Sequence, residues 1–181
     1  MASAEQVDLA ARVARLEAFE QIRQLAARYG LAADSRDIDG LIDLFTDDDR
    51  EHFQEGIRGR EALRGYYNES QRRYSNSQHF MCNHVVDVLD EDHATGVVYA
   101  YVEQELGDKW TVLALQYWDT YERQGDRWLF AERRAKPWYF TEWDEKPTGP
   151  MKMRFPDRPH GEAPLPQAWP TWDKFWSSTK R

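Results

Sequence analysis

Residues 95–122 read TGVVYAYVEQELGDKWTVLALQYWDTYE, and this stretch decides the fold. Val, Tyr, Trp and Thr dominate it, and apolar and polar side chains alternate along much of it, which is typical of β-strands. Gly107 and Asp108 leave room only for a tight turn between two such runs. So short a turn predicts antiparallel neighbours, because a parallel crossover needs about a dozen residues or more.

The same period of two extends on both sides of this stretch. We predict four strands, at about residues 78–89, 95–106, 110–122 and 127–140. The breaks between them are all short, so the strands form an antiparallel meander.

Helical spacing dominates the residues that precede the strands. An apolar stripe runs from Leu9 to Tyr29 and predicts one long helix, which shorter helices over about residues 38–45 and 60–74 follow. Helices followed by a meander predict an α+β fold, with the N-terminal helices packed on one face of a curved antiparallel sheet.

The last forty or so residues differ in composition from the rest. Seven of the eight prolines lie between positions 147 and 170, which excludes regular structure over most of that segment. We therefore predict a folded domain over residues 1–143 and a proline- and tryptophan-rich arm over residues 144–181. The arm lies over its own body or over a neighbouring subunit and ends in a short helix after Pro170.

Charge and cysteine content exclude several classes of protein. The 24 Lys and Arg against 32 Asp and Glu give a net charge of −8, which argues against a nucleic-acid surface. The single cysteine, Cys82, forms no intrachain disulfide, so we expect a reducing, cytoplasmic location. No apolar run reaches the length of a membrane helix, and we expect no membrane partner. The eight Trp, nine Tyr and eight Phe indicate a small aromatic ligand.

Sequence motifs for cofactors and metals are missing. There is no H-E-x-x-H, no zinc-type Cys/His pairing and no glycine-rich phosphate loop. We therefore expect no metal and no organic cofactor. The run Asp47-Asp48-Asp49 is interpreted as a solvated helix end, although its carboxylates leave a magnesium site open.

One histidine has a candidate carboxylate partner. Asp34 lies where the chain bends back from the long helix, and there it could accept a hydrogen bond from the imidazole of His79. Asp34 could equally be the N-cap of the second helix. His84 lies five residues from His79, so the two face opposite sides of the sheet unless a bulge intervenes. The face of His79 also carries Asn83, which becomes a candidate substrate contact.

Two short segments resemble a known family. Residues 29–39, YGLAADSRDID, resemble the first-helix motif of the nuclear transport factor 2-like superfamily, in its SnoaL-like and scytalone dehydratase branch, and residues 77–80, SQHF, resemble the strand motif of that branch. The likeness covers about residues 8–143. It implies a sheet curled into a cone around a deep apolar pocket. It also implies an aspartate-oriented histidine that acts on small hydroxylated substrates without metal or organic cofactor.

The resemblance assigns roles position by position. Asp34 falls on the orienting aspartate, His79 on the general base or acid, and Tyr29 on a pocket tyrosine of some bile-acid dehydratases. Two positions depart from scytalone dehydratase: Gln104 replaces its second catalytic histidine and Phe53 replaces its substrate-anchoring tyrosine. The resemblance therefore implies the scaffold and the His–Asp pair with a different substrate.

The alternation of side chains between the two faces of each strand predicts further pocket residues. If Gln104 faces inward, so do Val102 and, on the next strand, Tyr117, while Tyr101 faces out. A bulge would swap these sets, so Tyr101 stays a reserve candidate for the role of Tyr117.

The fourth strand and the arm offer further candidates. Either Arg133 or Arg134 is expected to reach the cavity mouth, unless both are solvated and paired with Asp119 and Glu132. We expect the terminal tryptophans to make interfaces and Trp138 and Phe140 to belong to the pocket wall. We expect Phe80 near the cavity or the core.

These features together predict an enzyme. We expect a cofactor-independent lyase in which His79 and Asp34 eliminate water, or release formaldehyde by C–C cleavage, from a hydroxylated aromatic or polycyclic molecule such as a lignin-derived diaryl compound. The alternatives are a ring isomerase or polyketide-type cyclase, and a non-catalytic small-molecule binding module. The resemblance implies a homo-oligomer through the outer face of the sheet, a trimer rather than a dimer. The predicted substrate contacts are Tyr29, Phe53, Asn83, Tyr101, Gln104, Tyr117 and Arg133.

Overall fold

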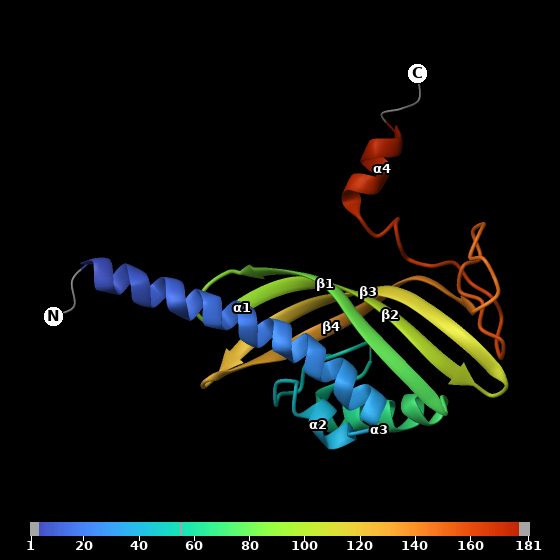
Figure 1. Ribbon diagram of the computed structural model, residues 1–181, viewed down its shortest axis with the longest axis horizontal. Helices are drawn as coiled ribbons and strands as arrows, with labels where there is room; N and C mark the ends of the chain where they lie inside the picture. Colours follow the sequence, from blue (N-terminus) through green and yellow to red (C-terminus); the bar gives the residue numbers. More distant parts are fainter. Residues whose placement is uncertain (1–3, 55, 178–181) are drawn as a thin grey trace.

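The computed structural model describes residues 4–54 and 56–177 and has the predicted order of helices followed by strands (Figure 1). Three helices come first, α1 (Ala4–Ser35), α2 (Ile38–Ile42) and α3 (Gly59–Arg72). Four strands follow, β1 (Asn76–Val88), β2 (His93–Leu106), β3 (Lys109–Gln124) and β4 (Arg127–Glu142), and the described chain ends in α4 (Pro170–Ser177). The α+β fold class is confirmed.

The four strands form one antiparallel sheet in the order β1-β2-β3-β4. The sheet is curved, α1 crosses one of its faces, and the sheet does not close into a barrel (Figure 1). On that face alternate residues of β2 are buried, including Val98, Val102 and Gln104, as the period of two predicts. The core therefore lies between the concave face of the sheet and the helices.

A bulge in β1 changes the direction of its second histidine. The register against β2 shifts between Met81 and His84, so His79 pairs with Val102 while His84 pairs with Val98. Both partners are buried on the concave face, and His84 Nε2 lies 3.0 Å from the buried Tyr121 hydroxyl. His79 and His84 therefore face the same side of the sheet through a bulge, which is the exception that the sequence left open, because the extra residue restores a common side.

The apolar stripe of α1 is divided between the core and solvent. Ile22, Leu25 and Tyr29 are buried against the sheet, whereas Leu9 and Leu16 are exposed. Figure 1 shows the reason, because the N-terminal half of α1 extends past the edge of the sheet. The predicted long helix is confirmed, and its apolar stripe is buried only in the second half of the helix.

The arm lies along β4 of its own chain. Phe140 N–H donates to the carbonyl of Lys152 at 2.9 Å, and Leu165 N–H donates to that of Pro137 at 3.2 Å. Trp138 packs edge-on against Trp169, with ring centroids 5.2 Å apart. Helix α4 begins at Pro170, as predicted, and projects away from the body (Figure 1).

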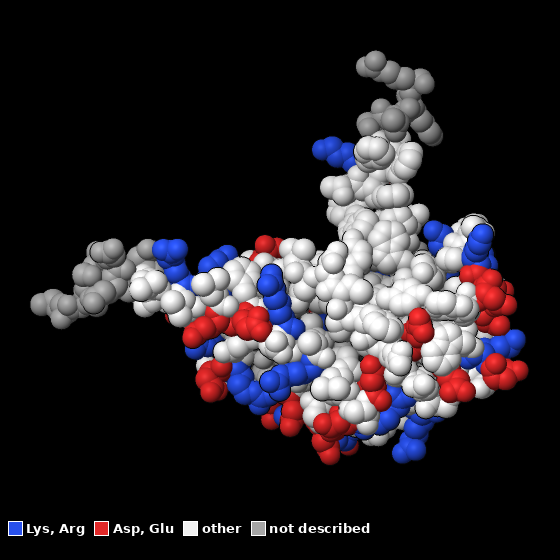
Figure 2. All heavy atoms as spheres, in the orientation of Figure 1, with Lys and Arg blue, Asp and Glu red and all other residues white. Residues whose placement is uncertain are grey.

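Acidic and basic side chains are interspersed over the face of the molecule in Figure 2, and uncharged residues prevail at the foot of α4. Among the described helices none is both long enough and apolar enough to span a membrane.

Candidate active site

A cavity of about 470 Å³ opens between the concave face of the sheet, the helices and the arm. Its walls are mainly aromatic and apolar, with a few polar groups. Five predicted residues line it, namely His79, Tyr29, Phe53, Gln104 and Tyr117. A cavity of this size suits a small organic ligand.

Asp34 contacts His79 directly from behind the cavity wall. His79 Nδ1 lies 2.6 Å from Asp34 Oδ1, and the backbone N–H of His79 donates to Oδ2 at 2.7 Å. An ionised carboxylate only accepts hydrogen bonds, so Nδ1 carries a proton, and in the neutral form of the ring Nε2 has the free lone pair. Within the described chain, no group hydrogen-bonds to Nε2, and the ring lines the cavity.

The carboxylate of Asp34 is stabilised in its ionised form. Partial burial acts to raise its pKa, but the hydrogen bonds from the side chain and backbone of His79 and from Ser77 outweigh this and lower it. Ser77 Oγ donates to Asp34 Oδ1 at 3.0 Å, and Arg36 Nη1 donates to the same Ser77 oxygen at 2.7 Å. Asp34 therefore stays ionised near neutral pH and holds the imidazole in one orientation.

Asp34 belongs to the last turn of α1 and is not the cap of the second helix. Asp37 takes that place, since its side chain accepts a hydrogen bond from the N–H of Gly40 at 2.9 Å. Asp37 therefore caps α2, and the carboxylate of Asp34 accepts hydrogen bonds from β1 instead.

Gly30 allows α1 to approach β1 at this point. A Cβ atom added to Gly30 would lie 3.2 Å from His79 Cβ and 3.2 Å from Met81 Cγ, closer than side chains normally pack. Glycine therefore sets the helix-to-strand distance that the Asp34–His79 contact needs.

The variant Gly30→Ala is expected to displace His79 by a few tenths of an ångström and, in a reaction in which His79 takes part, to lower kcat about 3- to 10-fold. Crowding of about 1–3 kcal/mol is partly offset by the helix preference of alanine, about 0.5–1 kcal/mol, so the protein remains folded. The matched control is Gly65→Ala in α3, where an added Cβ meets nothing within 4 Å. Equal rates for the two variants would contradict this account of Gly30.

Buried tyrosines surround the inner part of the cavity. The hydroxyl oxygens of Tyr29 and Tyr67 are 3.2 Å apart, and the Tyr29 ring packs edge-on against Tyr117 at 5.5 Å and against His79 at 6.3 Å. Burial, above all, raises the pKa of Tyr29, Tyr67 and Tyr117 well above 10. These phenols therefore stay protonated and act as hydrogen-bond donors rather than as acids.

The sequence of the folded domain shows its family. Residues 14–134 match the SnoaL-like domain family. The chain belongs to that family. No curated protein matches the sequence. The resemblance inferred from the two short motifs is thereby confirmed.

Solved structures share the fold of this SnoaL-like chain. A proposed scytalone dehydratase from Novosphingobium aromaticivorans is 18% identical, with a TM-score of 0.66 over 80% of this chain and 99% of that one. A hexachlorocyclohexane dehydrochlorinase, LinA type 3, from Novosphingobium barchaimii is 23% identical, with a TM-score of 0.67 over 77% of this chain and 99% of that one. A protein of unknown function from Mycobacterium tuberculosis is 29% identical, with a TM-score of 0.61 over 69% and 74% of the two chains. The structural relatives of the family thus include lyase-type enzymes that act on small molecules.

Two predicted substrate contacts of the SnoaL-like domain, and a residue expected near the cavity or the core, lie away from the cavity. Asn83 is exposed within the bulge of β1, and Tyr101 packs on the outer face against Phe80, with ring centroids 6.4 Å apart. Phe80 is itself half exposed. Asn83 and Tyr101 are therefore corrected to surface positions, as is Phe80, because strand alternation and the bulge turn them from the cavity.

Arg133 lies behind the cavity wall rather than at its mouth. Its side chain is fully buried and makes two hydrogen bonds to Asp119, at 2.9 and 2.7 Å. Its guanidinium carbon lies 4.3 Å from the ring centre of Tyr29 and 4.2 Å from that of Tyr117. The direct substrate contact predicted for Arg133 is corrected to support of two tyrosines that line the cavity. Arg134 pairs with Glu132, as the alternative interpretation held.

Several cavity residues were not singled out from the sequence. Helix α3 contributes Tyr66 and Tyr67, and Tyr74 follows two residues after the helix ends. Their helical spacing marked them as apolar positions, but nothing in the pattern showed that they face a cavity. The arm contributes Met153, Phe155 and Arg158, for which irregular proline-rich sequence gave no direction. Phe140 lines the cavity as expected, whereas Trp138 pairs with Trp169 outside it.

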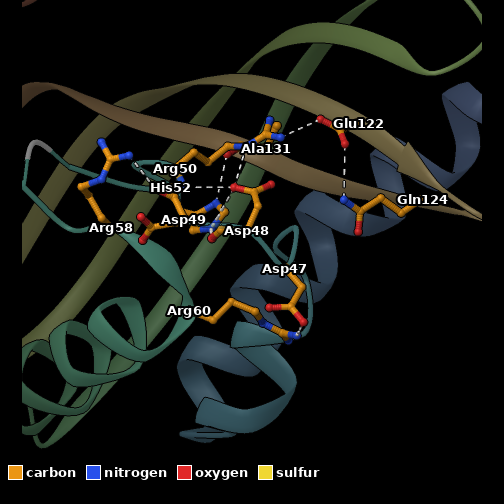
Figure 3. A network of polar contacts seen from close by, with 10 residues as sticks. All are labelled: Asp47, Asp48, Asp49, Arg50, His52, Arg58, Arg60, Glu122, Gln124 and Ala131. Atoms are coloured by element: carbon orange, nitrogen blue, oxygen red, sulfur yellow. Dashed lines mark hydrogen bonds and ion pairs between the residues drawn. The ribbon is translucent and has the colours of Figure 1, made fainter.

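The acidic run is held by neighbouring arginines and a buried histidine (Figure 3). Asp48 pairs with Arg50 at 2.7 Å, and Arg58 donates to the carbonyl of Asp49. The buried ring of His52 lies between the carbonyls of Asp48 and Ala131, at 3.2 and 3.1 Å. Over residues 4–54 and 56–177, no group of three or more His, Cys, Asp or Glu side chains is placed to hold a metal ion.

His84 does not supply a second acid or base to the cavity. Burial is the main cause that lowers its pKa to about 4, so it is neutral near pH 7. It lines a different hollow, beneath α1, together with Arg23 and Met81. Of the five histidines, all within the described residues, His79 is therefore the one that lines the cavity.

Proposed function

We propose that the chain is a cofactor-independent lyase that eliminates water from a hydroxylated aromatic or polycyclic small molecule, or releases formaldehyde from it by C–C cleavage. The contact that carries this proposal is the 2.6 Å approach of His79 Nδ1 to Asp34, which leaves Nε2 as a base in an aromatic cavity. General acid–base catalysis of this kind contributes about 10²–10⁴-fold, so it suits a substrate already activated by a phenol or carbonyl.

One proton carrier is sufficient for the elimination. His79 Nε2 takes a proton from the carbon next to the hydroxylated one, and the C–H electron pair forms the double bond as the C–O bond breaks. The departing hydroxide receives the same proton back and leaves as water, so His79 ends neutral. This suits a cavity in which Gln104 stands where scytalone dehydratase has its second histidine.

Formaldehyde release uses the same base on a different proton. His79 takes the proton of a hydroxymethyl O–H, and the C=O bond of formaldehyde forms as the C–C bond breaks. The electron pair of the broken C–C bond forms a new C=C bond, and the hydroxyl group on the adjacent carbon leaves as hydroxide. This hydroxide then takes the proton from His79. A diaryl compound with two hydroxyl groups would thus yield an alkene, formaldehyde and water.

The other cavity groups hold the substrate oxygens. Gln104 is 8% exposed, and its Oε1 has no hydrogen-bond partner in the described part of the chain. A buried acceptor without a partner is costly, so a donor on the substrate would stabilise it. A substrate hydroxyl supplies that donor, while the Tyr29 and Tyr117 phenols are placed to donate to substrate oxygens.

The decisive test compares turnover and binding in His79→Ala. The variant is expected to lose turnover of phenolic diols, followed as an ultraviolet change, while it still binds them, because the cavity walls remain. Mass analysis for formaldehyde separates the two eliminations. Turnover that persists in the variant rejects the His–Asp mechanism, and binding without turnover in the unsubstituted protein favours the binding module.

A ring isomerase or polyketide-type cyclase is the alternative enzyme. The same base would then move a proton without loss of water or formaldehyde, so the product would have the mass of the substrate. Product mass therefore distinguishes the lyase from this alternative.

A further inference from the structure

The arm carries a stack of rings to the mouth of the cavity. The ring of Phe155 stacks on that of Phe140 in β4, with centroids 4.1 Å apart and an angle of 27° between the planes. Backbone hydrogen bonds fix this pairing, because Phe140 N–H donates to Lys152 O and Arg154 N–H donates to Phe140 O at 2.7 Å. These arm residues lie beyond residues 14–134, the part that matches the family.

Arg158 completes the stack. Its guanidinium carbon lies 3.5 Å from the centre of the Phe155 ring, and Arg158 itself lines the cavity. Stacking occupies one face of the guanidinium and leaves its N–H groups, which lie in the plane, available to acceptors. The stacking on Phe155 thus orients the Arg158 side chain while its N–H groups remain available to an acceptor.

The neighbouring arginines are already paired. Arg73 pairs with Asp157, and Arg154 lies 3.5 Å from Glu145 and also donates to backbone carbonyls. Arg158, by contrast, makes no hydrogen bond or ion pair to a carboxylate or carbonyl among the residues that the structure describes, and its guanidinium lies over the Phe155 ring. Arg158 is exposed at the mouth, where water solvates its unused N–H groups, and an anionic ligand in the cavity would exchange that water for charge-assisted hydrogen bonds.

The positive charge of Arg158 affects two tyrosines that line the cavity. Burial raises the pKa of Tyr66 and of Tyr74, and the positive charge of Arg158 acts against this rise at both phenols. Glu69, on α3, is the carboxylate among the lining residues and is exposed. The mouth thus carries Arg73, Arg158 and Glu69, of which Arg73 is neutralised by Asp157.

We propose that Arg158 is an anion subsite, and that the substrate carries an anionic oxygen on an aromatic ring, a carboxylate or an ionised phenol. The Phe155–Phe140 stack contacts the ring that bears this group, and Arg158 pairs with its oxygen at the mouth. The inference rests on the proposed function in one respect, that the cavity is the substrate site. It makes Arg158 a residue that determines specificity.

The test measures binding, so that it does not depend on turnover. Three probes with the same two-ring frame are titrated by calorimetry at low salt: biphenyl-4-carboxylate, 3-nitrobiphenyl-4-ol at a pH where its phenol is ionised, and the neutral biphenyl-4-carboxamide. Arg158→Gln is expected to weaken the anionic probes about 10-fold and to leave the carboxamide within about twofold. The loss should shrink as salt is added, because the mouth is open to solvent. The two anionic probes show separately whether a carboxylate or a phenolate is preferred.

Lys152→Gln is the matched control, since it removes the same charge from the arm at a residue that does not line the cavity. It should leave the affinity of all three probes unchanged. Equal weakening of charged and neutral probes by Arg158→Gln, or anionic probes that bind the unsubstituted protein no better than the carboxamide, overturns the inference. Repeating the titrations in His79→Ala separates the anion subsite from the proposed lyase mechanism, because loss of the base leaves the anion subsite in place.

Discussion

Replacement of Asp34 with asparagine is expected to lower kcat by about 10²–10⁴-fold, the range that a lost general base produces. Both carboxylate oxygens accept hydrogen bonds, Oδ2 from the backbone N–H of His79 and Oδ1 from Nδ1–H of the same residue and from Ser77. Asparagine has one acceptor oxygen, so its NH₂ group must face one of these donors. If it faces Nδ1, the imidazole proton moves to Nε2 and the base is lost.

The measurement is steady-state kinetics on the substrate identified with the unsubstituted protein, together with a binding titration. Asp34→Asn should change kcat far more than substrate affinity, because Asp34 lies behind His79. Ser77→Ala is the graded control, since it removes one of three hydrogen bonds to the carboxylate and leaves the tautomer in place. We expect it to cost about 10-fold or less. A kcat for Asp34→Asn within a factor of three of the original would show that Asp34 does not orient the base.

Much of the fold could be predicted from local pattern. Alternation in β2 and β3 specified which residues face the core, and short turns such as Gly107-Asp108 specified the antiparallel order. The pattern failed at the bulge of β1, because an extra residue changes the facing of His84 without leaving a mark in hydrophobicity. It also failed for Leu9 and Leu16, since a helix has the same spacing whether or not a sheet lies beneath it.

The sequence predicted the part of the candidate site that lies in two recognisable motifs. It did not predict the part that the arm contributes. Asp34 and His79 are separated along the chain, but each stands in a motif of its own, and the structure places them 2.6 Å apart. Phe155 and Arg158 lie in a segment with no period, so only the folded chain shows that they reach the cavity. Either Arg133 or Arg134 was expected at the mouth because consecutive strand residues point to opposite faces of the sheet. A paired arginine can be buried, and its partner Asp119 lies on a neighbouring strand.

Removal of the buried cation in Arg133→Met is expected to reduce the free energy of unfolding by about 3–5 kcal/mol. The side chains of Arg133 and Asp119 are both fully buried. Without Arg133 the carboxylate of Asp119 keeps the hydrogen bond from the Tyr121 hydroxyl, at 2.8 Å, and has no counter-charge. Burial acts to lower the pKa of Arg133, but Asp119 outweighs it and raises that pKa above the usual value, so the guanidinium of Arg133 keeps its charge in the core.

Urea unfolding followed by circular dichroism measures this loss, and a double variant identifies its cause. Asp119→Asn removes the charge that Arg133→Met leaves unpaired while it keeps an acceptor for Tyr121. We therefore expect Arg133→Met/Asp119→Asn to be more stable than Arg133→Met alone, which a simple loss of two contacts would not produce. If the double variant is less stable than the single one, the cost lies in the packing of Arg133 against Tyr29, Tyr117 and Phe130. In that case the guanidinium supports the aromatic wall of the cavity chiefly by its shape.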